Sequence, residues 1–372
     1  MYDNRGIEKL ANGLQRRNIG YFAKWRTGKD GFQRYIASDI PWAHLTHVNY
    51  AFAHIDSDNR ISANEDVPGN EATDIDWPEV KGAEMDPALP YKGHFNLLGK
   101  FKRKYPNLKT LVSVGGWAET GGYYGARGGR VVSGGFYSMT TNGGGTVNSA
   151  GINVFADSVV AFLRRYGFDG VDIDYEYPTT MPNSGYLPDW GVAEPRLKGL
   201  QAGYREMMRV LRERLDVASV RDGRYYLLSS AVTASAYLLR GMEGNQAVRY
   251  LDFVNVMSYD LHGTWNEFVG PQAALFDDGK DAELLSWNVY SDTQYKNIGY
   301  LNTDWAYHYY RGALPPGRIN VGVPYYTRGW REVTGGDRGL WGKAAASSCP
   351  LGVVPPCGLG AKGIDKIGRA HV

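Results

Sequence analysis

Seven short runs of β-branched and aromatic residues recur along the chain, and each predicts a strand. Three of the segments between them repeat apolar residues every three or four positions, which is the spacing of one buried helix face. The strands are expected at Asn18–Trp25, Leu45–Ile55, Thr110–Gly116, Gly167–Pro178, Tyr225–Ala234, Leu251–Tyr259 and Ile319–Tyr326. The helices are expected at Phe95–Tyr105, Ala150–Tyr166 and Glu194–Leu215. Strands that alternate with helices indicate parallel strands joined by crossovers.

This order of elements predicts an α/β fold, a TIM (β/α)8 barrel. The first strand is not followed by the Gly-x-Gly-x-x-Gly turn of a dinucleotide-binding sheet, so a barrel is favoured over that fold. Two stretches rich in turn-forming residues, Asp56–Lys92 and Gly121–Asn148, are expected to be loops at strand ends. A barrel of this type has eight strands, and the pattern supplies seven. The barrel is therefore expected to be truncated after strand 7, which would leave the chain inactive and prone to aggregation.

The composition argues against several classes of protein. The chain has 41 Lys and Arg residues against 39 Asp and Glu, with the two signs mixed, so neither a nucleic-acid footprint nor a polybasic membrane patch is expected. Its apolar runs are shorter than the ~18 residues of a membrane helix, and the stretch before Asn18 lacks the apolar core of a signal peptide. Aromatic residues make up 13% of the chain, which is typical of surfaces that stack flat apolar rings or sugar faces. Cys349 and Cys357 are expected to form a local disulfide, with two free thiols as the alternative.

The most informative segment runs from Phe168 to Pro178 and reads Phe-Asp-Gly-Val-Asp-Ile-Asp-Tyr-Glu-Tyr-Pro. Because side chains alternate between the faces of a strand, Asp172, Asp174 and Glu176 are expected on one face, about 6.6 Å apart. Three carboxyl groups in a confined interior cannot all ionise cheaply, so a proton is shared and their pKa values are pushed apart. General acid catalysis requires such a protonated acid near neutral pH. Pro178 ends the strand, which places Glu176 at the C-terminal mouth, where barrel enzymes hold their active sites.

Two other interpretations of this segment are less favoured. A solvated edge strand would also carry acidic residues, but Val171, Ile173 and Tyr175 on the opposite face require a buried strand. A calcium-binding loop shares the Asp-x-Asp-x-Glu alternation, yet the Gly of its sixth position is absent and the surrounding sequence forms strands. The pattern therefore favours a buried catalytic strand.

The motif Asp169-Gly-x-Asp172-x-Asp174-x-Glu176 resembles the signature of the family 18 glycoside hydrolases, the chitinases. Three other segments agree with that family in order and spacing. They are Ser113-Val-Gly-Gly-Trp117, Met257-Ser-Tyr-Asp260 and Pro324-Tyr-Tyr-Thr-Arg-Gly-Trp330, on the third, sixth and seventh strands. The resemblance covers residues 18 to about 330 and is greatest to bacterial secreted chitinases that carry a small α+β insertion after strand 7.

The resemblance implies that the β-1,4 bonds between N-acetylglucosamine units are hydrolysed with retention of configuration and with assistance from the substrate. Glu176 would protonate the glycosidic oxygen and later activate water, while the substrate's own acetamido oxygen attacks the anomeric carbon. Asp174 would orient that acetamido group, and Asp172 would hold or exchange a shared proton. Tyr259 would donate a hydrogen bond to the acetamido oxygen. Neither a metal nor an organic cofactor is implied.

The same resemblance implies a set of substrate-binding residues at the strand ends. Asp260 and Arg328 would bind sugar hydroxyl and acetamido groups. The walls of the site would come from Trp117, Tyr177, Tyr326, Tyr21, Phe52 and Met257, with Ser113 on the inward face of the third strand. Thr327 stands where the motif of the family more often has Gly.

Domain organisation and location are also implied by the resemblance. Residues 1–17 are expected to be an N-terminal extension, 18–330 the catalytic barrel and 331–366 the beginning of the insertion domain. Residues 367–372 match one reading frame of a common sequencing adapter and are expected to be non-native. The protein is expected to be secreted and monomeric. Its expected partner is chitin or N-acetylglucosamine oligomers, with no nucleic acid and no membrane.

Two other functions share these motifs. A chitinase-like lectin keeps the barrel and binds sugar without cleaving it, but such proteins generally lose the terminal acid, and Glu176 is present. An endo-β-N-acetylglucosaminidase would use the same acidic strand to cut the core of N-glycans. The supply of aromatic residues and the complete motifs on the third and sixth strands favour chitin.

Overall fold

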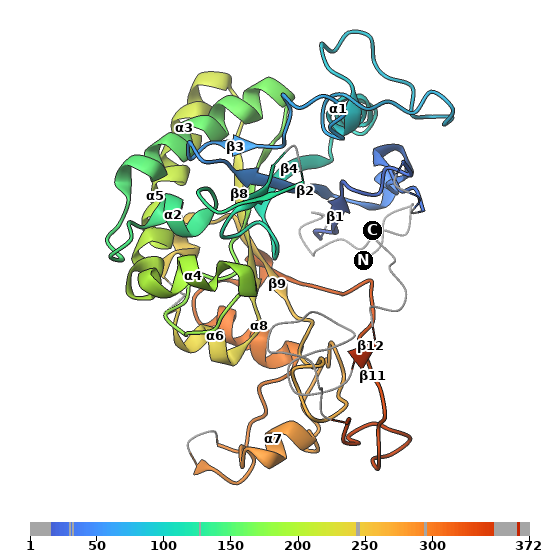
Figure 1. The fold of residues 1–372 in the computed structure, drawn as a ribbon. Coiled ribbons are helices and arrows are strands. Elements are labelled where there is room, and N and C mark those ends of the chain that lie inside the picture. The colour runs from blue at the N-terminus through green and yellow to red at the C-terminus, as the bar shows by residue number, and fades with distance from the viewer. Residues whose placement is uncertain are drawn as a thin grey trace.

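One curled sheet of parallel strands forms the centre of the molecule (Figure 1). The computed structural model describes residues 16–29, 31, 33–125, 128–242, 246–293 and 296–345, and the backbone of a short strand at 363–364. The parallel strands pair in the order in which the chain forms them. They are β1 (Ile19–Ala23), β2 (His47–Ile55), β4 (Lys109–Gly115), β7 (Gly170–Asp174), β8 (Leu227–Thr233), β9 (Phe253–Met257) and β10 (Ile319–Val321). Each overlaps one of the seven predicted strands, and the arrangement confirms a fold of the TIM-barrel type.

Helices cover the outer face of this sheet, and α3 packs against α5 (Figure 1). The helices are α1 (Gly93–Lys104), α2 (Phe136–Thr140), α3 (Ser149–Tyr166), α4 (Trp190–Ala193), α5 (Leu197–Asp222), α6 (Ala236–Arg240), α7 (Ala282–Ser286) and α8 (Thr303–Arg311). The three predicted helices are confirmed as α1, α3 and α5. The last of these runs past the predicted end at Leu215, because it stops only where Gly223 adopts the left-handed conformation of a C-terminal cap.

The two predicted loops contain short elements of their own. Residues 56–92 include β3 (Ile61–Ser62), which pairs antiparallel with β2. Residues 121–148 include β5 (Tyr123–Tyr124), β6 (Arg130–Val131) and α2. Phe136 and Met139 of α2 are fully buried, so the burial of apolar side chains orders a segment whose glycines predict a loop. A last antiparallel pair joins β11 (Gly329–Trp330) to β12 (Gly363–Ile364).

The two faces of the sheet differ in chemistry. Outward-facing residues such as Val112, Val114, Val171 and Ile173 join the buried apolar faces of the helices in one core. The inward side chains at the centre of the sheet are mainly polar and are also buried; among them are Ser113, Asp172, Ser229 and Asn255. Burial of polar groups is tolerated where they form hydrogen bonds with one another. The barrel interior therefore holds the polar side chains from which a catalytic site could be built.

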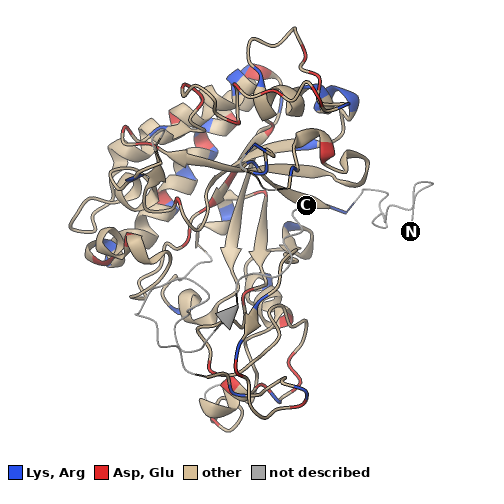
Figure 2. Cartoon of the chain, turned by 45° about the vertical axis from the view of Figure 1, so that its right-hand side comes forward, with Lys and Arg blue, Asp and Glu red and all other residues tan. Residues whose placement is uncertain are grey.

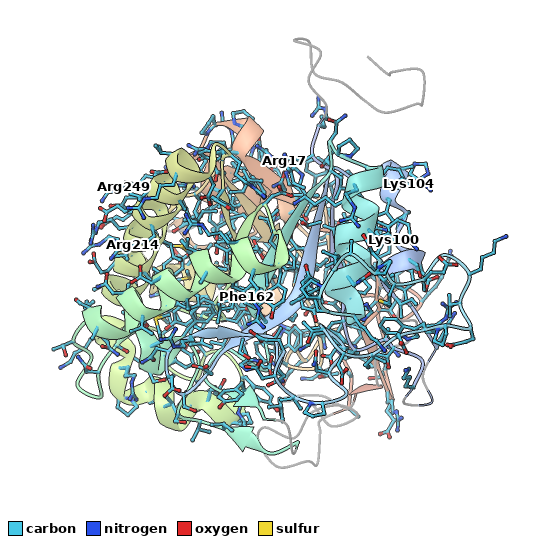
Figure 3. The ribbon with its side chains drawn as sticks, turned by 90° about the horizontal axis from the view of Figure 1, so that it is seen from above. Arg17, Lys100, Lys104, Phe162, Arg214 and Arg249 are labelled. Atoms are coloured by element: carbon cyan, nitrogen blue, oxygen red, sulfur yellow. The ribbon has the colours of Figure 1, made fainter. Side chains whose placement is uncertain are left out.

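Charged residues of both signs intermingle over the helices in Figure 2. Seen from above, Arg214 and Arg249 lie on one outer side of the molecule and Lys100 and Lys104 on the other, with Phe162 between them (Figure 3). Across the described part of the chain, no helix is both long and apolar enough to cross a bilayer. Cys349 and Cys357, and nearly all of 346–372, lie outside the described residues. The predicted domain boundaries and disulfide stay predictions.

Candidate active site

Sheet register brings the acidic motif into the interior beside the third predicted strand. Ser113 pairs with Asp172 and Gly115 with Asp174 between β4 and β7. A Cβ atom on Gly115 would lie 2.5 Å from the carbonyl oxygen of Asp174, so glycine is required for this close approach. Asp172, Asp174 and Glu176 are all buried, as the alternation predicts. This burial contradicts the interpretation of the segment as a solvated edge strand.

Asp172 lies at the centre of a hydrogen-bond network that joins five strands. Its Oδ2 accepts from Ser113 at 2.7 Å and from Tyr21 at 2.9 Å. Its Oδ1 accepts from Ser229 at 2.6 Å and from the Asn255 amide at 3.3 Å. Burial raises the pKa of Asp172, and these four donors oppose that rise because they stabilise the carboxylate.

Among the described residues, the carboxyl group of Asp174 has fewer hydrogen-bond partners than that of Asp172. Its Oδ1 is buried and has no hydrogen-bond partner in the described part of the chain. Burial, followed by the neighbouring carboxyl groups of Glu176 and Asp172, raises the pKa of Asp174 well above its ordinary value. Asp174 therefore has the more strongly raised pKa of the two aspartates, while the hydrogen bonds to Asp172 favour the ionised form of that carboxyl group.

Glu176 lies two residues beyond the end of β7, so the observed strand is shorter than the predicted Gly167–Pro178. Its Oε2 accepts a hydrogen bond of 2.8 Å from the hydroxyl of Tyr177. The sequence resemblance assigns Tyr177 to the sugar-binding wall, whereas the structure places its hydroxyl on the candidate acid. Tyr21 and Ser113 likewise direct their hydroxyls to Asp172, and contact of these three residues with substrate stays a prediction.

Tyr259 follows β9 and lies on the same side of the sheet as the acids. Burial, then Asp174, Tyr326 and Glu176, raises the pKa of Tyr259 well above its ordinary value. The hydroxyl therefore stays protonated and can donate a hydrogen bond. Its ring meets that of Tyr326 edge to face at 6.1 Å, which confirms that the predicted strand-6 and strand-7 motifs are neighbours.

Asp260 and Arg328 form a two-pronged ion pair at the mouth. Arg328 Nε lies 2.8 Å from Asp260 Oδ1, and Nη2 lies 2.7 Å from Oδ2. Gln272 also donates to Oδ1, at 3.2 Å. The Arg328 guanidinium stacks 4.9 Å from the centre of the Trp265 ring. A planar guanidinium held in this way is fixed in orientation.

Aromatic side chains line the rim around these polar groups. Trp117 is half exposed and meets Tyr186 edge to face at 6.2 Å. Phe52 packs against Gly116, where a Cβ atom would lie 2.9 Å from its ring. Met257 ends β9 and is partly exposed. Trp25 and Trp265 are also exposed, and neither was selected from the sequence. Trp25 is the last residue of the first predicted strand and Trp265 follows the motif that ends at Asp260, and these positions were the available signals.

Ser229 and Asn255 were also missed. Both stand on the inward face of strands that were correctly predicted, but nothing in their own segments points to Asp172. Only the pairing of β8 with β7 and β9 brings them to that carboxyl group. No cluster of three or more His, Cys, Asp or Glu side chains suited to a metal ion occurs within the described residues.

Comparison with known proteins identifies the family to which a chain with this geometry belongs. The family described as Glycosyl hydrolases family 18 matches residues 17–358. The chain belongs to this family. A family 18 chitinase from Chromobacterium violaceum, known as a crystal structure, is 65% identical with a TM-score of 0.90 over 99% of this chain and 52% of that one. The predicted resemblance and barrel fold are thereby confirmed.

More distantly related members of the family also match most of this chain. Chitinase A1 of Niallia circulans is 31% identical over 341 residues, which cover 84% of this chain and 42% of that protein. A family 18 N-acetylglucosaminidase structure from Paenibacillus barengoltzii is 26% identical with a TM-score of 0.59, over 88% of this chain and 74% of that one. This glycosyl hydrolase chain thus spans about half the length of the first two relatives.

Proposed function

We propose that the protein is a chitinase that cleaves β-1,4 bonds between N-acetylglucosamine units with retention of configuration. The observation that carries the proposal is the buried Oδ1 of Asp174, which has no hydrogen-bond partner within the described residues and belongs to the motif that also holds Asp172 and Glu176. A buried polar atom without a partner is costly, and the N–H of an acetamido group would satisfy it. A sugar without that group would leave it unsatisfied.

The proposed reaction begins with proton transfer from Glu176 to the glycosidic oxygen as the bond from that oxygen to C1 breaks. The acetamido carbonyl oxygen forms a bond to C1 from the opposite face and gives an oxazolinium ion. Asp174 orients this nucleophile through the N–H, and Tyr259 donates to the carbonyl oxygen. The negative charge of Asp172 stabilises the cation. Glu176 then removes a proton from water, which attacks C1 and regenerates the acetamide.

The rim residues supply recognition of the sugar chain in this proposal. Trp117 and Trp25 present exposed aromatic surface on which pyranose rings can stack, while the ring of Trp265 packs against the Arg328 guanidinium. Asp260 and Arg328 offer acceptors and donors of fixed orientation to hydroxyl and acetamido groups. Secretion, expected from the family resemblance, fits an insoluble extracellular polymer as substrate.

The first test is the substitution Glu176→Gln in the full-length protein. The amide keeps the shape of the side chain but has no proton to give, so hydrolysis of chitin oligomers should fall by at least about 10³-fold. Binding of the same oligomers should change by no more than a few fold. Turnover above one part in a hundred of the parent rate would refute the assignment of Glu176 as the acid.

The second test concerns the acetamido group of the substrate. Colloidal chitin should be hydrolysed with retention, fully deacetylated chitosan should be inert, and EDTA should have no effect. Cleavage of a denatured glycoprotein in preference to chitin would favour the N-glycan-cleaving activity instead. Binding of chitin without any cleavage would favour a lectin, and inactivation by EDTA that added metal reverses would contradict the mechanism.

A further inference from the structure

Sheet pairing does not fix the peptide of Glu176. The last backbone hydrogen bond that ties β7 to the chain after β4 runs from Gly116 N–H to Asp174 O, at 2.9 Å. The candidate acid stands two residues further on, where β7 has ended. Other groups must therefore hold the backbone from which its carboxyl group extends.

Thr120 holds the amide side of this residue. Its Oγ1 accepts a hydrogen bond of 3.0 Å from the Glu176 N–H and donates one of 3.0 Å to Gly116 O. An amide can only donate and a carbonyl can only accept, so the two contacts fix the direction of the hydroxyl proton. Thr120 is fully buried, and water cannot replace it.

Tyr137 holds the carbonyl side in the same way. Its hydroxyl donates to Glu176 O at 3.1 Å and accepts from Tyr177 N–H at 3.2 Å. Burial raises the pKa of Tyr137, so the hydroxyl remains protonated. The ring is buried to 1% exposure. Both peptide groups of Glu176 are thus bonded to side-chain hydroxyls.

The two hydroxyls belong to one packed segment. Phe136 N–H donates to Thr120 O at 2.6 Å, so the residue before Tyr137 is bonded to Thr120. The Gly121 N–H donates to the buried carboxyl group of Asp189 at 3.0 Å. Asp189 in turn forms an ion pair with Arg130. This segment after β4 is therefore tied down independently of Glu176.

We propose that Thr120 and Tyr137 are positioning residues that set the place of the Glu176 carboxyl group relative to the scissile bond. The inference rests on the proposed role of Glu176 as general acid. A displacement of about 1 Å at a catalytic group can cost on the order of 10² in rate. Loss of either hydroxyl should therefore impair proton donation more than substrate binding.

The test compares isosteric variants on two substrates. Thr120→Val and Tyr137→Phe remove the hydroxyls, and Thr120→Ser restores one. Thr73→Val and Tyr310→Phe are matched controls, because these hydroxyls bond to the carbonyl oxygens of Glu65 and Thr233 and touch neither Glu176 nor Tyr137. One substrate is a chitin oligomer, whose leaving group needs a proton. The other is an N-acetylglucosamine oligomer with a dinitrophenyl leaving group, which needs none.

Thr120→Val and Tyr137→Phe should lower kcat on the chitin oligomer by about 10- to 100-fold with KM within about threefold. On the dinitrophenyl substrate the first-turnover release of dinitrophenolate, which precedes the step in which Glu176 acts as base, should fall by less than about threefold. Thr120→Ser should recover most of the rate on the chitin oligomer. Equal losses on both substrates, or losses no larger than those of the controls, would overturn the inference. Thermal melts of all variants show whether a loss of activity comes from misfolding of the protein or from misplacement of the Glu176 carboxyl group.

Glu176→Gln is measured on the same two substrates. If it keeps its activity on the chitin oligomer, the proposed function itself fails. If it is inactive there while Thr120→Val and Tyr137→Phe match their controls, only the positioning inference fails.

Discussion

Asp172 and Asp174 are separated by one residue and both are buried, yet their surroundings differ sharply. Asp172 accepts four hydrogen bonds from side chains of four other strands. Asp174 leaves one oxygen unpartnered within the described residues. A site that keeps an unsatisfied group until substrate arrives is destabilised in its empty state. The cost at Asp174 can therefore be measured as stability.

The substitution Asp174→Asn should stabilise the protein in a pH-dependent way. The pKa of Asp174 is raised by burial above the ordinary value near ~4. The folded protein thus binds this proton more tightly than the unfolded chain, and the free energy of unfolding falls as pH rises through the raised pKa. Asparagine has no such proton. The Tm gain of Asp174→Asn should be large at pH 8 and shrink towards pH 4.

Thermal melts of parent and variant across this pH range check the prediction. Asp58→Asn is the control for the replacement of a carboxyl group by an amide, because Asp58 is exposed. A Tm difference for Asp174→Asn that stays constant across the pH range would show that the carboxyl group carries no such penalty. Activity should be lost at every pH, through loss of nucleophile orientation.

Sequence reasoning selected the residues of this site unevenly. The three acids and Tyr259 were selected because alternation along one strand, or a matched motif, contains them entirely. Ser229 and Asn255 were not found, because their role depends on which strands become neighbours. Tyr177 was selected, but the bond from its hydroxyl to Glu176 depends on the local path of the chain after β7. That path is set by tertiary contacts to Thr120 and Tyr137.

At the scale of elements, the spacing between β4 and β7 depends on one glycine. Gly115 has a φ of +100°, and a Cβ atom there would lie 2.5 Å from Asp174 O and 2.6 Å from the ring of Phe136. Neither neighbour can retreat easily, since one is backbone and the other is fully buried. The strand that carries Asp174 would have to move.

Gly115→Ala should therefore lower both stability and activity. Overpacking of this kind costs roughly 1–3 kcal/mol, and the positive φ adds about 1 kcal/mol. Gly191→Ala is the matched control, because its Cβ would meet nothing within 4 Å and its φ is not positive. Denaturant unfolding of the two variants measures the difference. A Gly115→Ala variant as stable as Gly191→Ala would mean that β4 and β7 are not as closely packed as described.

The main elements were predictable because each one repeats a single period over its length. All seven parallel strands and the three long helices carry such a pattern. Helix α2 was not predicted, since only Phe136, Tyr137 and Met139 mark it within a stretch rich in glycine. Its stability comes from burial against the core, including a ring stack of Phe136 on Tyr175 at 4.7 Å. Tertiary packing, not local pattern, orders such short elements.

At the scale of the whole molecule, the sheet has two ends, β1 and β10. Within the described residues, each pairs with one neighbouring strand of the sheet only. They are linked across the interior by Asn320, Asn255 and Tyr21, which are joined by hydrogen bonds of 3.0 and 2.9 Å. Just before these two strands in the chain, Arg17 donates a hydrogen bond to Gly317 O, and its guanidinium stacks 4.5 Å from the centre of the Phe253 ring. The barrel curvature predicted from sequence is thus maintained by polar contacts where backbone pairing stops.

Exposed apolar side chains follow one another along β10 and the residues after it. Val321, Val323 and Tyr325 alternate along this segment and are 46%, 68% and 53% exposed. An apolar row beside backbone groups that have no strand partner within the described residues is a template for association with another chain. The 372-residue chain should therefore self-associate, with a mean mass in sedimentation velocity that rises with concentration. Val323→Lys should shift the population towards monomer, since a charge at such an edge opposes pairing. Val220→Lys, which removes a still more exposed valine from α5, should leave the association unchanged, and an equal effect of the two substitutions would show that β10 is not the associating edge.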